Sequence, residues 1–205
     1  MLETILLSTC AIALSEIGDK TQLLTFALAA RFRNPLPIVL GIFASTLLNH
    51  GLAASLGYWI NTWLTPGILR WVLVASFIAM GLWMLIPDRD DGSAEKSPYA
   101  KYGAFAATAI LFFLAEMGDK TQIATVALAA KLGTVIPVMM GTTIGMLLAD
   151  VPVVFVGDRF AKYIPMKLLH AAAALVFIGF GIAAWLADPA SFMQSLPEAS
   201  RAAAP

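Results

Sequence analysis

Long apolar stretches follow one another along the chain, separated by short polar interruptions. A helix needs about 20 apolar residues to cross the hydrocarbon core of a bilayer. The segments that meet this length are 3–30, 36–60, 68–87, 101–130, 135–156 and 168–187. The pattern therefore predicts an all-α integral membrane protein with six transmembrane helices.

The composition also indicates a membrane protein. Hydrophobic residues make up 60% of the chain and charged residues 13%, whereas soluble domains carry about 25% charged residues. Thirteen basic residues balance thirteen acidic ones, so no basic surface indicates a nucleic-acid partner. Cys10 is the single cysteine, which excludes a disulfide framework and a cysteine metal site.

The positions of Lys and Arg predict how the chain is oriented, because short loops rich in these residues stay in the cytoplasm. With the N-terminus outside, the outer side holds only Arg70, Lys131 and Arg201. The inner loops then hold Arg31, Arg33, Arg89, Lys96, Lys101, Arg159, Lys162 and Lys167. We therefore expect both termini outside and the acidic linker 88–98 in the cytoplasm.

An internal repeat with an offset of one hundred residues covers nearly the whole chain. The windows 15–32 and 115–132 are identical at eleven of 18 positions. This divides the chain into a first three-span repeat, a linker, a second three-span repeat and a tail that we expect to be disordered. Their bounds are 1–87, 88–98, 99–187 and 188–205.

An odd number of spans in each repeat has a geometric consequence, because the two copies must then cross the membrane in opposite orientations. Inverted repeats of this kind are typical of secondary transporters, whose binding site lies near the midplane between the halves. A duplication kept only for packing is the alternative, and it does not explain why the copies share charged residues.

The most similar part of the repeat is charged and lies in the middle of an apolar segment: "EIGDKTQ" at 16–22 and "EMGDKTQ" at 116–122. A carboxylate at the centre of a membrane helix costs on the order of 3 kcal/mol. Residues at i, i+3 and i+4 of a continuous helix share one face. We therefore expect Glu16, Asp19 and Lys20 to point the same way, with Lys20 within reach of Glu16.

If the two motifs face each other, they form one site with a surplus of negative charge. The site then holds the carboxylates Glu16, Asp19, Glu116 and Asp119 and the lysines Lys20 and Lys120. Its net charge is −2 when all are ionised, which one divalent cation or two protons would neutralise. If the lysines only joined helices by ion pairs, two buried carboxylates would stay unpaired and take up protons. Competition between a metal ion and protons is what an antiporter requires.

The donor atoms near these carboxylates limit which cations the site would bind. The motifs add the side chains of Thr21, Thr121, Gln22 and Gln122, and a helix break at Gly18 or Gly118 would add backbone carbonyls. An all-oxygen set suits Mg²⁺, Ca²⁺ or Mn²⁺ better than copper or zinc, and it does not decide among the three.

The second and fifth apolar segments carry polar residues at matching positions. Asn49 and His50 lie halfway along the second segment, and Asp150 occupies the position of His50 in the fifth. These side chains would complete the coordination shell or relay protons, and for Asn49 and His50 an interhelical hydrogen bond is an equal alternative. The small residues at 41, 45, 141 and 145 predict faces where helices pack closely.

The two motifs resemble the duplicated E-x-G-D-[KR]-[ST] signature of a cation/proton antiporter family. Its members include bacterial manganese exporters of the MneA and Mnx types and eukaryotic transporters that load manganese and calcium into Golgi and chloroplast compartments. The resemblance covers nearly the whole chain and implies that Glu16, Asp19, Glu116 and Asp119 bind Mn²⁺, or Mn²⁺ and Ca²⁺. Since no long extension precedes the first motif, it also implies a bacterial plasma-membrane exporter.

We therefore expect a secondary transporter in the lipid bilayer that exports Mn²⁺, or Mn²⁺ and Ca²⁺, against protons, with no permanently bound cofactor. Lys20 and Lys120 would hold the empty carboxylates in place, and assembly into a homo-oligomer stays open. The alternatives are an exporter of basic amino acids or other small cations, and a channel or structural membrane subunit. Because the chain has no nucleophile–base set or cofactor fingerprint, we do not expect an enzyme.

Overall fold

The computed structural model describes residues 1–86, 98–156 and 166–187. All regular elements in these ranges are helices. The tail 188–205 and all of the linker 88–98 except its last residue lie outside the described residues. So do several basic residues on which the orientation was predicted, namely Arg89, Lys96, Arg159, Lys162 and Arg201.

The helices follow the same order in the two repeats. The first repeat consists of α1 (Leu2–Glu16), α2 (Lys20–Phe32), α3 (Pro35–Trp63) and α4 (Pro66–Met84). The second consists of the 3₁₀ helix η1 (Pro98–Tyr102), α5 (Gly103–Glu116), α6 (Lys120–Leu132), α7 (Ile136–Val156) and α9 (Met166–Leu186). The segments 3–30 and 101–130, each expected to hold one span, are thus each broken into two helices at the charged motif.

Among the described helices, α3, α4 and α7 are long and apolar enough to cross a membrane. Helix α5 and the Ala171–Leu186 part of α9 are apolar but shorter. These properties agree with an all-helical membrane protein.

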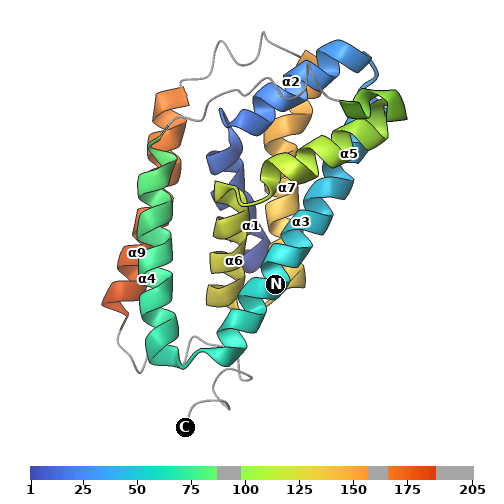
Figure 1. The fold of residues 1–205 in the computed structure, drawn as a ribbon. Helices are drawn as coiled ribbons and strands as arrows, with labels where there is room; N and C mark the ends of the chain where they lie inside the picture. The colour runs from blue at the N-terminus through green and yellow to red at the C-terminus, as the bar shows by residue number, and fades with distance from the viewer. Residues whose placement is uncertain (87–97, 157–165, 188–205) are drawn as a thin grey trace.

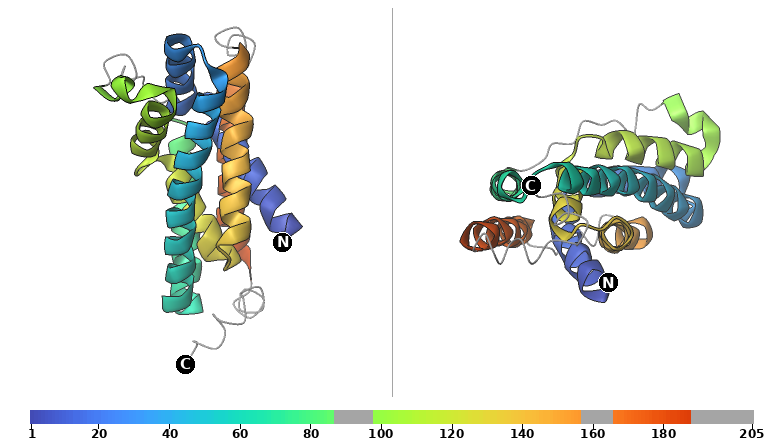
Figure 2. Two further views of the ribbon diagram at one scale, coloured as in Figure 1. Left: turned by 90° about the vertical axis from the view of Figure 1, so that its right-hand side faces the viewer. Right: turned by 90° about the horizontal axis from the view of Figure 1, so that it is seen from below.

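Helices α4 and α9 lie side by side at one edge of the molecule, which both views make clear (Figures 1 and 2). A Cβ atom placed on Gly81 of α4 would lie 2.5 Å from Ile178 Cγ1, and one on Gly181 of α9 would lie 2.8 Å from Ile78 Cγ1. The contact is therefore reciprocal: Gly81 meets Ile178, and the equivalent residue of the second repeat, Gly181, meets Ile78, the equivalent of Ile178.

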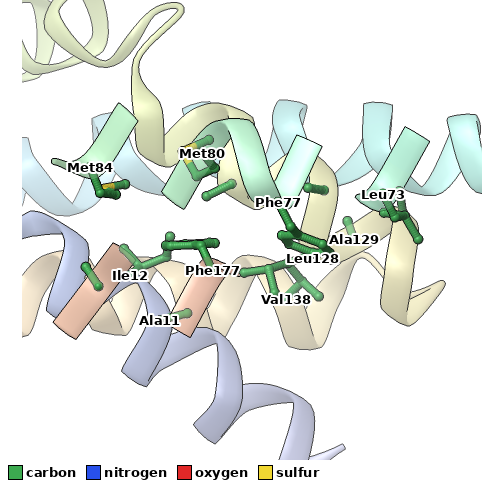
Figure 3. Packing of buried hydrophobic residues seen from close by; sticks show 14 of the residues in the cluster. Ala11, Ile12, Leu73, Phe77, Met80, Met84, Leu128, Ala129, Val138 and Phe177 are labelled. Carbon is green, nitrogen blue, oxygen red and sulfur yellow. The ribbon is translucent and has the colours of Figure 1, made fainter. Parts of the chain in front are cut away.

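The buried apolar side chains form two separate clusters. The larger one joins α1 and α6 to the α4–α9 pair, and in it Phe77 lies 6.4 Å from Phe177 between ring centroids (Figure 3). The smaller one joins α2 and α5 to α3 and α7. Each broken segment thus places one half in each cluster, so the two breaks lie between the clusters.

The small residues predicted to form packing faces do so. A Cβ atom on Gly141 would lie 2.5 Å from the carbonyl oxygen of Ile5 in α1, so α7 lies directly against α1. A Cβ atom on Gly41 would lie 2.9 Å from the carbonyl oxygen of Phe105 in α5, so α3 lies directly against α5. These close approaches hold both broken segments against α3 and α7.

Candidate cation site

The two breaks at the charged motifs have nearly the same backbone. Ile17 and Met117 both have φ −65° and ψ 113°, and Gly18 and Gly118 have φ values of 92° and 76°. In both breaks the amide of the following aspartate donates to the carbonyl of the preceding glutamate at 3.0 Å. These are the features of a type II turn, whose third residue needs a positive φ and is therefore usually glycine.

The turn makes one sequence-based prediction wrong. Glu16, Asp19 and Lys20 do not lie on one continuous helix, because α1 ends at Glu16 and Asp19 is the N-cap residue of α2. The i, i+3, i+4 spacing therefore does not set the directions of their side chains.

The threonine and glutamine of each motif hold the turn in place. Thr21 Oγ1 donates to Glu16 Oε2 at 2.7 Å, and Gln22 Oε1 accepts the amide of Gly18 at 2.9 Å. The second motif repeats these contacts, from Thr121 to Glu116 at 3.3 Å and from Gly118 to Gln122 at 2.7 Å. The motif thus encodes both the break in the helix and the position of its glutamate.

Three of the four predicted carboxylate ligands lie together. Glu16, Asp19 and Asp119 each offer one oxygen atom, and these atoms all lie within 4.8 Å of one another. All three side chains are buried, with Glu16 fully inaccessible to solvent. Glu116 is also fully buried, but it is outside this group, and its Oε2 lies 3.6 Å from His50 Nε2.

The motif lysines form ion pairs with the aspartate of the opposite repeat. Lys20 Nζ lies 2.7 Å from Asp119 Oδ1, and Lys120 Nζ lies 3.9 Å from Asp19 Oδ1. Lys120 also donates to the carbonyl of Ile86, just after α4, at 3.1 Å. The ion pairs therefore join the two repeats. The sequence-based expectation was different, since it placed Lys20 near Glu16 of its own motif.

The polar residues of α3 and α7 reach the motif of the other repeat. Gln122 donates to Asn49 Oδ1 in α3. Gln22 donates to the carbonyl of Ala149 in α7 at 2.8 Å, and Thr25 Oγ1 donates to Asp150 Oδ1 at 2.8 Å. Asn49 and Asp150 are both fully buried. His50 lies against Glu116; the sequence left open whether it binds the cation or relays protons, or instead makes an interhelical hydrogen bond.

Acidic groups outnumber the basic groups at this site. Glu16 lies within electrostatic range of four other carboxyl groups, those of Glu116, Asp19, Asp150 and Asp119. Among the described residues, Glu16 Oε1, Glu116 Oε1 and Asp150 Oδ2 are buried and have no hydrogen-bond partner. Each such buried acceptor costs about 1–3 kcal/mol, and a bound cation or a proton would remove this cost.

Comparison with known proteins gives consistent results. The family described as "Divalent cation/proton antiporter GDT1" matches residues 4–92 and 104–191, two ranges that begin one hundred positions apart. A protein of Vibrio cholerae named "Putative manganese exporter" is 47% identical over 89% of this chain and 90% of its own length. GDT1-like protein 3 of Arabidopsis thaliana is 28% identical over 87% of this chain and 69% of its own length. No solved structure matches the chain.

Proposed function

The chain belongs to the GDT1 family of divalent cation/proton antiporters, which are membrane transporters and not enzymes, and from this we propose that it exports Mn²⁺ in exchange for protons. The observation that carries the proposal is the group of three buried carboxylates, drawn from both motifs, with oxygen atoms within 4.8 Å of one another. The name of the Vibrio cholerae relative favours Mn²⁺ as the main cargo. We add Ca²⁺ as a second cation because it also binds oxygen ligands.

The proposed architecture is two inverted repeats of three spans, at 1–87 and 99–187, in which α1–α2 and α5–α6 each make one broken span. The equal backbone angles of the two breaks support it. So does the reciprocal contact of α4 with α9, since a two-fold axis makes each surface meet its own counterpart.

In the proposed exchange, Glu16, Asp19 and Asp119 bind the cation when they are ionised. Protonation removes their negative charge and so displaces the metal ion, because a metal ion binds the deprotonated form of its ligands. Lys20 and Lys120 pair with the aspartates and so partly neutralise the site when the cation has left. The protonated site then returns across the membrane and carries the protons inward, since two protons and the two lysines together balance the four motif carboxylates.

Alternating access follows from the unequal packing of the half-helices. With both termini outside, α1 and α6 form the outer halves of the broken spans, and α2 and α5 form the cytoplasmic halves. The outer halves pack on the α4–α9 pair as well as on α3 and α7, whereas the buried apolar residues of the cytoplasmic halves cluster with α3 and α7. At the outer end, Lys131 Nζ lies 4.5 Å from the centroid of the Phe180 ring. We assign this arrangement to the inward-facing state, which is closed on the outer side.

Transport into inside-out membrane vesicles of a bacterial expression host tests this function. An acidic vesicle interior should drive uptake of Mn²⁺, because protons leave as the cation enters. Glu16→Gln and Asp119→Asn should abolish this uptake. Glu3→Gln removes a carboxylate at the exposed start of α1 and should leave it unchanged.

Two results would contradict the proposal. The first is proton-driven Mn²⁺ uptake that survives both Glu16→Gln and Asp119→Asn, which would place the cation elsewhere. The second is uptake of arginine or lysine that Mn²⁺ does not inhibit, which would favour an exporter of basic amino acids.

A further inference from the structure

We propose that His50 donates a ring nitrogen to the transported cation and thereby selects transition-metal ions over Ca²⁺. This inference rests on the proposed function, because it concerns the same site. It adds a nitrogen donor from α3 to a set of ligands that otherwise consists of oxygen atoms.

The surroundings of His50 carry the inference. Its side chain is fully buried, and among the described residues neither ring nitrogen has a hydrogen-bond partner. The nearest charged group is Glu116, whose Oε2 lies 3.6 Å from Nε2, which is too long for a hydrogen bond. Glu116 Oε1 is likewise buried without a partner. A cation bound to both side chains would satisfy Glu116 Oε1 and one of the two ring nitrogens.

A short chain of contacts connects this pair to the three grouped carboxylates. Thr121 Oγ1 lies 3.3 Å from Glu116 Oε2 and 3.5 Å from Asp119 Oδ2. Glu116 also lies within electrostatic range of Glu16. A cation that enters the group and recruits Glu116, the fourth motif carboxylate, therefore meets His50 as the next donor.

The chemistry of the imidazole sets the direction of the selectivity. Ca²⁺ binds six to eight oxygen ligands and gains little from a nitrogen donor. First-row transition-metal ions accept imidazole more readily than Ca²⁺ does, and their affinity for a given site rises from Mn²⁺ through Fe²⁺ to Co²⁺. The counterpart of His50 in the second repeat is Asp150, a carboxylate. His50→Asp therefore places at this position the residue that the chain itself uses at the equivalent position.

Pulsed electron paramagnetic resonance of Mn²⁺ bound to the purified protein tests the contact directly. A coordinated imidazole nitrogen couples to the unpaired electrons, and the coupling changes when the histidines are labelled with ¹⁵N. The chain has two histidines, so His170→Ala serves as the matched control. We expect the label-dependent coupling in the wild type and in His170→Ala, and its loss in His50→Asp.

Selectivity provides a second measurement. By calorimetric titration, His50→Asp should shift the ratio of Mn²⁺ to Ca²⁺ affinities towards Ca²⁺ by about tenfold, which corresponds to about 1.4 kcal/mol. An unchanged ratio in a folded variant would overturn the proposal. So would Mn²⁺ bound to the wild type without any coupling to histidine nitrogen, a result that does not depend on whether the variant folds.

The same samples separate this inference from the proposed function. If Mn²⁺ binds and Glu16→Gln removes the binding, but no histidine nitrogen is coupled, only the role of His50 is wrong. If the wild type binds no Mn²⁺, or Glu16→Gln binds it equally well, the proposed cation site itself is wrong.

Discussion

A single methyl group at Gly118 tests whether the segment 101–130 is broken into two helices at the second motif. Gly118 has φ 76°, and a Cβ atom built on it meets no other atom within 4 Å. Gly118→Ala therefore causes no steric clash with its neighbours, and its whole cost comes from the left-handed backbone. That conformation costs an L-residue roughly 1–2 kcal/mol.

Gly179 in α9 provides a matched control, because it also has open space around a built Cβ atom and lies inside a helix. Alanine is favoured over glycine in a helix interior by about 1 kcal/mol. Gly118→Ala and Gly179→Ala add the same atom, yet their effects on the free energy of unfolding should have opposite signs. The expected difference between them is about 2–3 kcal/mol.

Reversible unfolding with sodium dodecyl sulfate in mixed micelles, followed by circular dichroism, measures both free energies. Because the turn positions Glu116 and Asp119, Gly118→Ala should also weaken Mn²⁺ binding, whereas Gly179→Ala should not. Gly118→Asn should recover part of the loss, since asparagine tolerates the left-handed region. If the two alanine variants are equally stable, residue 118 does not have a left-handed backbone and the helix runs through the motif.

Two further substitutions test the ion pairs and the α4–α9 contact. Lys20→Met removes the partner that competes with the cation for Asp119, 2.7 Å away. Because Lys20 is one-third exposed, the pair contributes at most about 1 kcal/mol, so Mn²⁺ affinity measured by titration should rise by up to about fivefold. An unchanged or lower affinity would show that Lys20 does not compete. Gly81→Ala should destabilise the protein by about 1–3 kcal/mol in the same unfolding assay, and by more than Gly181→Ala does. A Cβ atom at position 81 would lie 2.9 Å from the carbonyl oxygen of Ala174, whereas the backbone atom nearest to a Cβ at position 181 is 3.3 Å away. Equal losses would contradict the packing of α4 on α9.

The residue types of the motif are those of a helix break, although the hydropathy of the segment does not indicate one. Gly18 occupies the position of a type II turn that needs a positive φ, and Asp19 is a common residue type at a helix N-cap. Apolar residues continue on both sides of the motif, so the segment 3–30 still has the length of one span. The sequence therefore predicted the place of the charges but left the break open.

The partners of the charged residues were not predictable in this way. Lys20 was expected near Glu16 by counting along a helix, but the turn redirects the chain and Lys20 pairs with Asp119. The contact of His50 with Glu116 joins α3 to the end of α5, and only the packing of these helices reveals it. The signal in the sequence was the pair of polar residues at positions 50 and 150, where the repeats carry different side chains.

The crossed ion pairs would allow one set of charges to serve both states of the proposed transport cycle. Each pair joins the start of α2 or α6 to the aspartate that precedes the other helix, so it connects the broken segment of one repeat to that of the other. The pairs are unequal, at 2.7 Å for Lys20–Asp119 and 3.9 Å for Lys120–Asp19. If the repeats exchange roles between inward-facing and outward-facing states, these lengths should interchange, with Lys120 tightening as Lys20 loosens. One aspartate is then closely paired in either state, and the lysine that competes most strongly with the cation changes between Lys20 and Lys120.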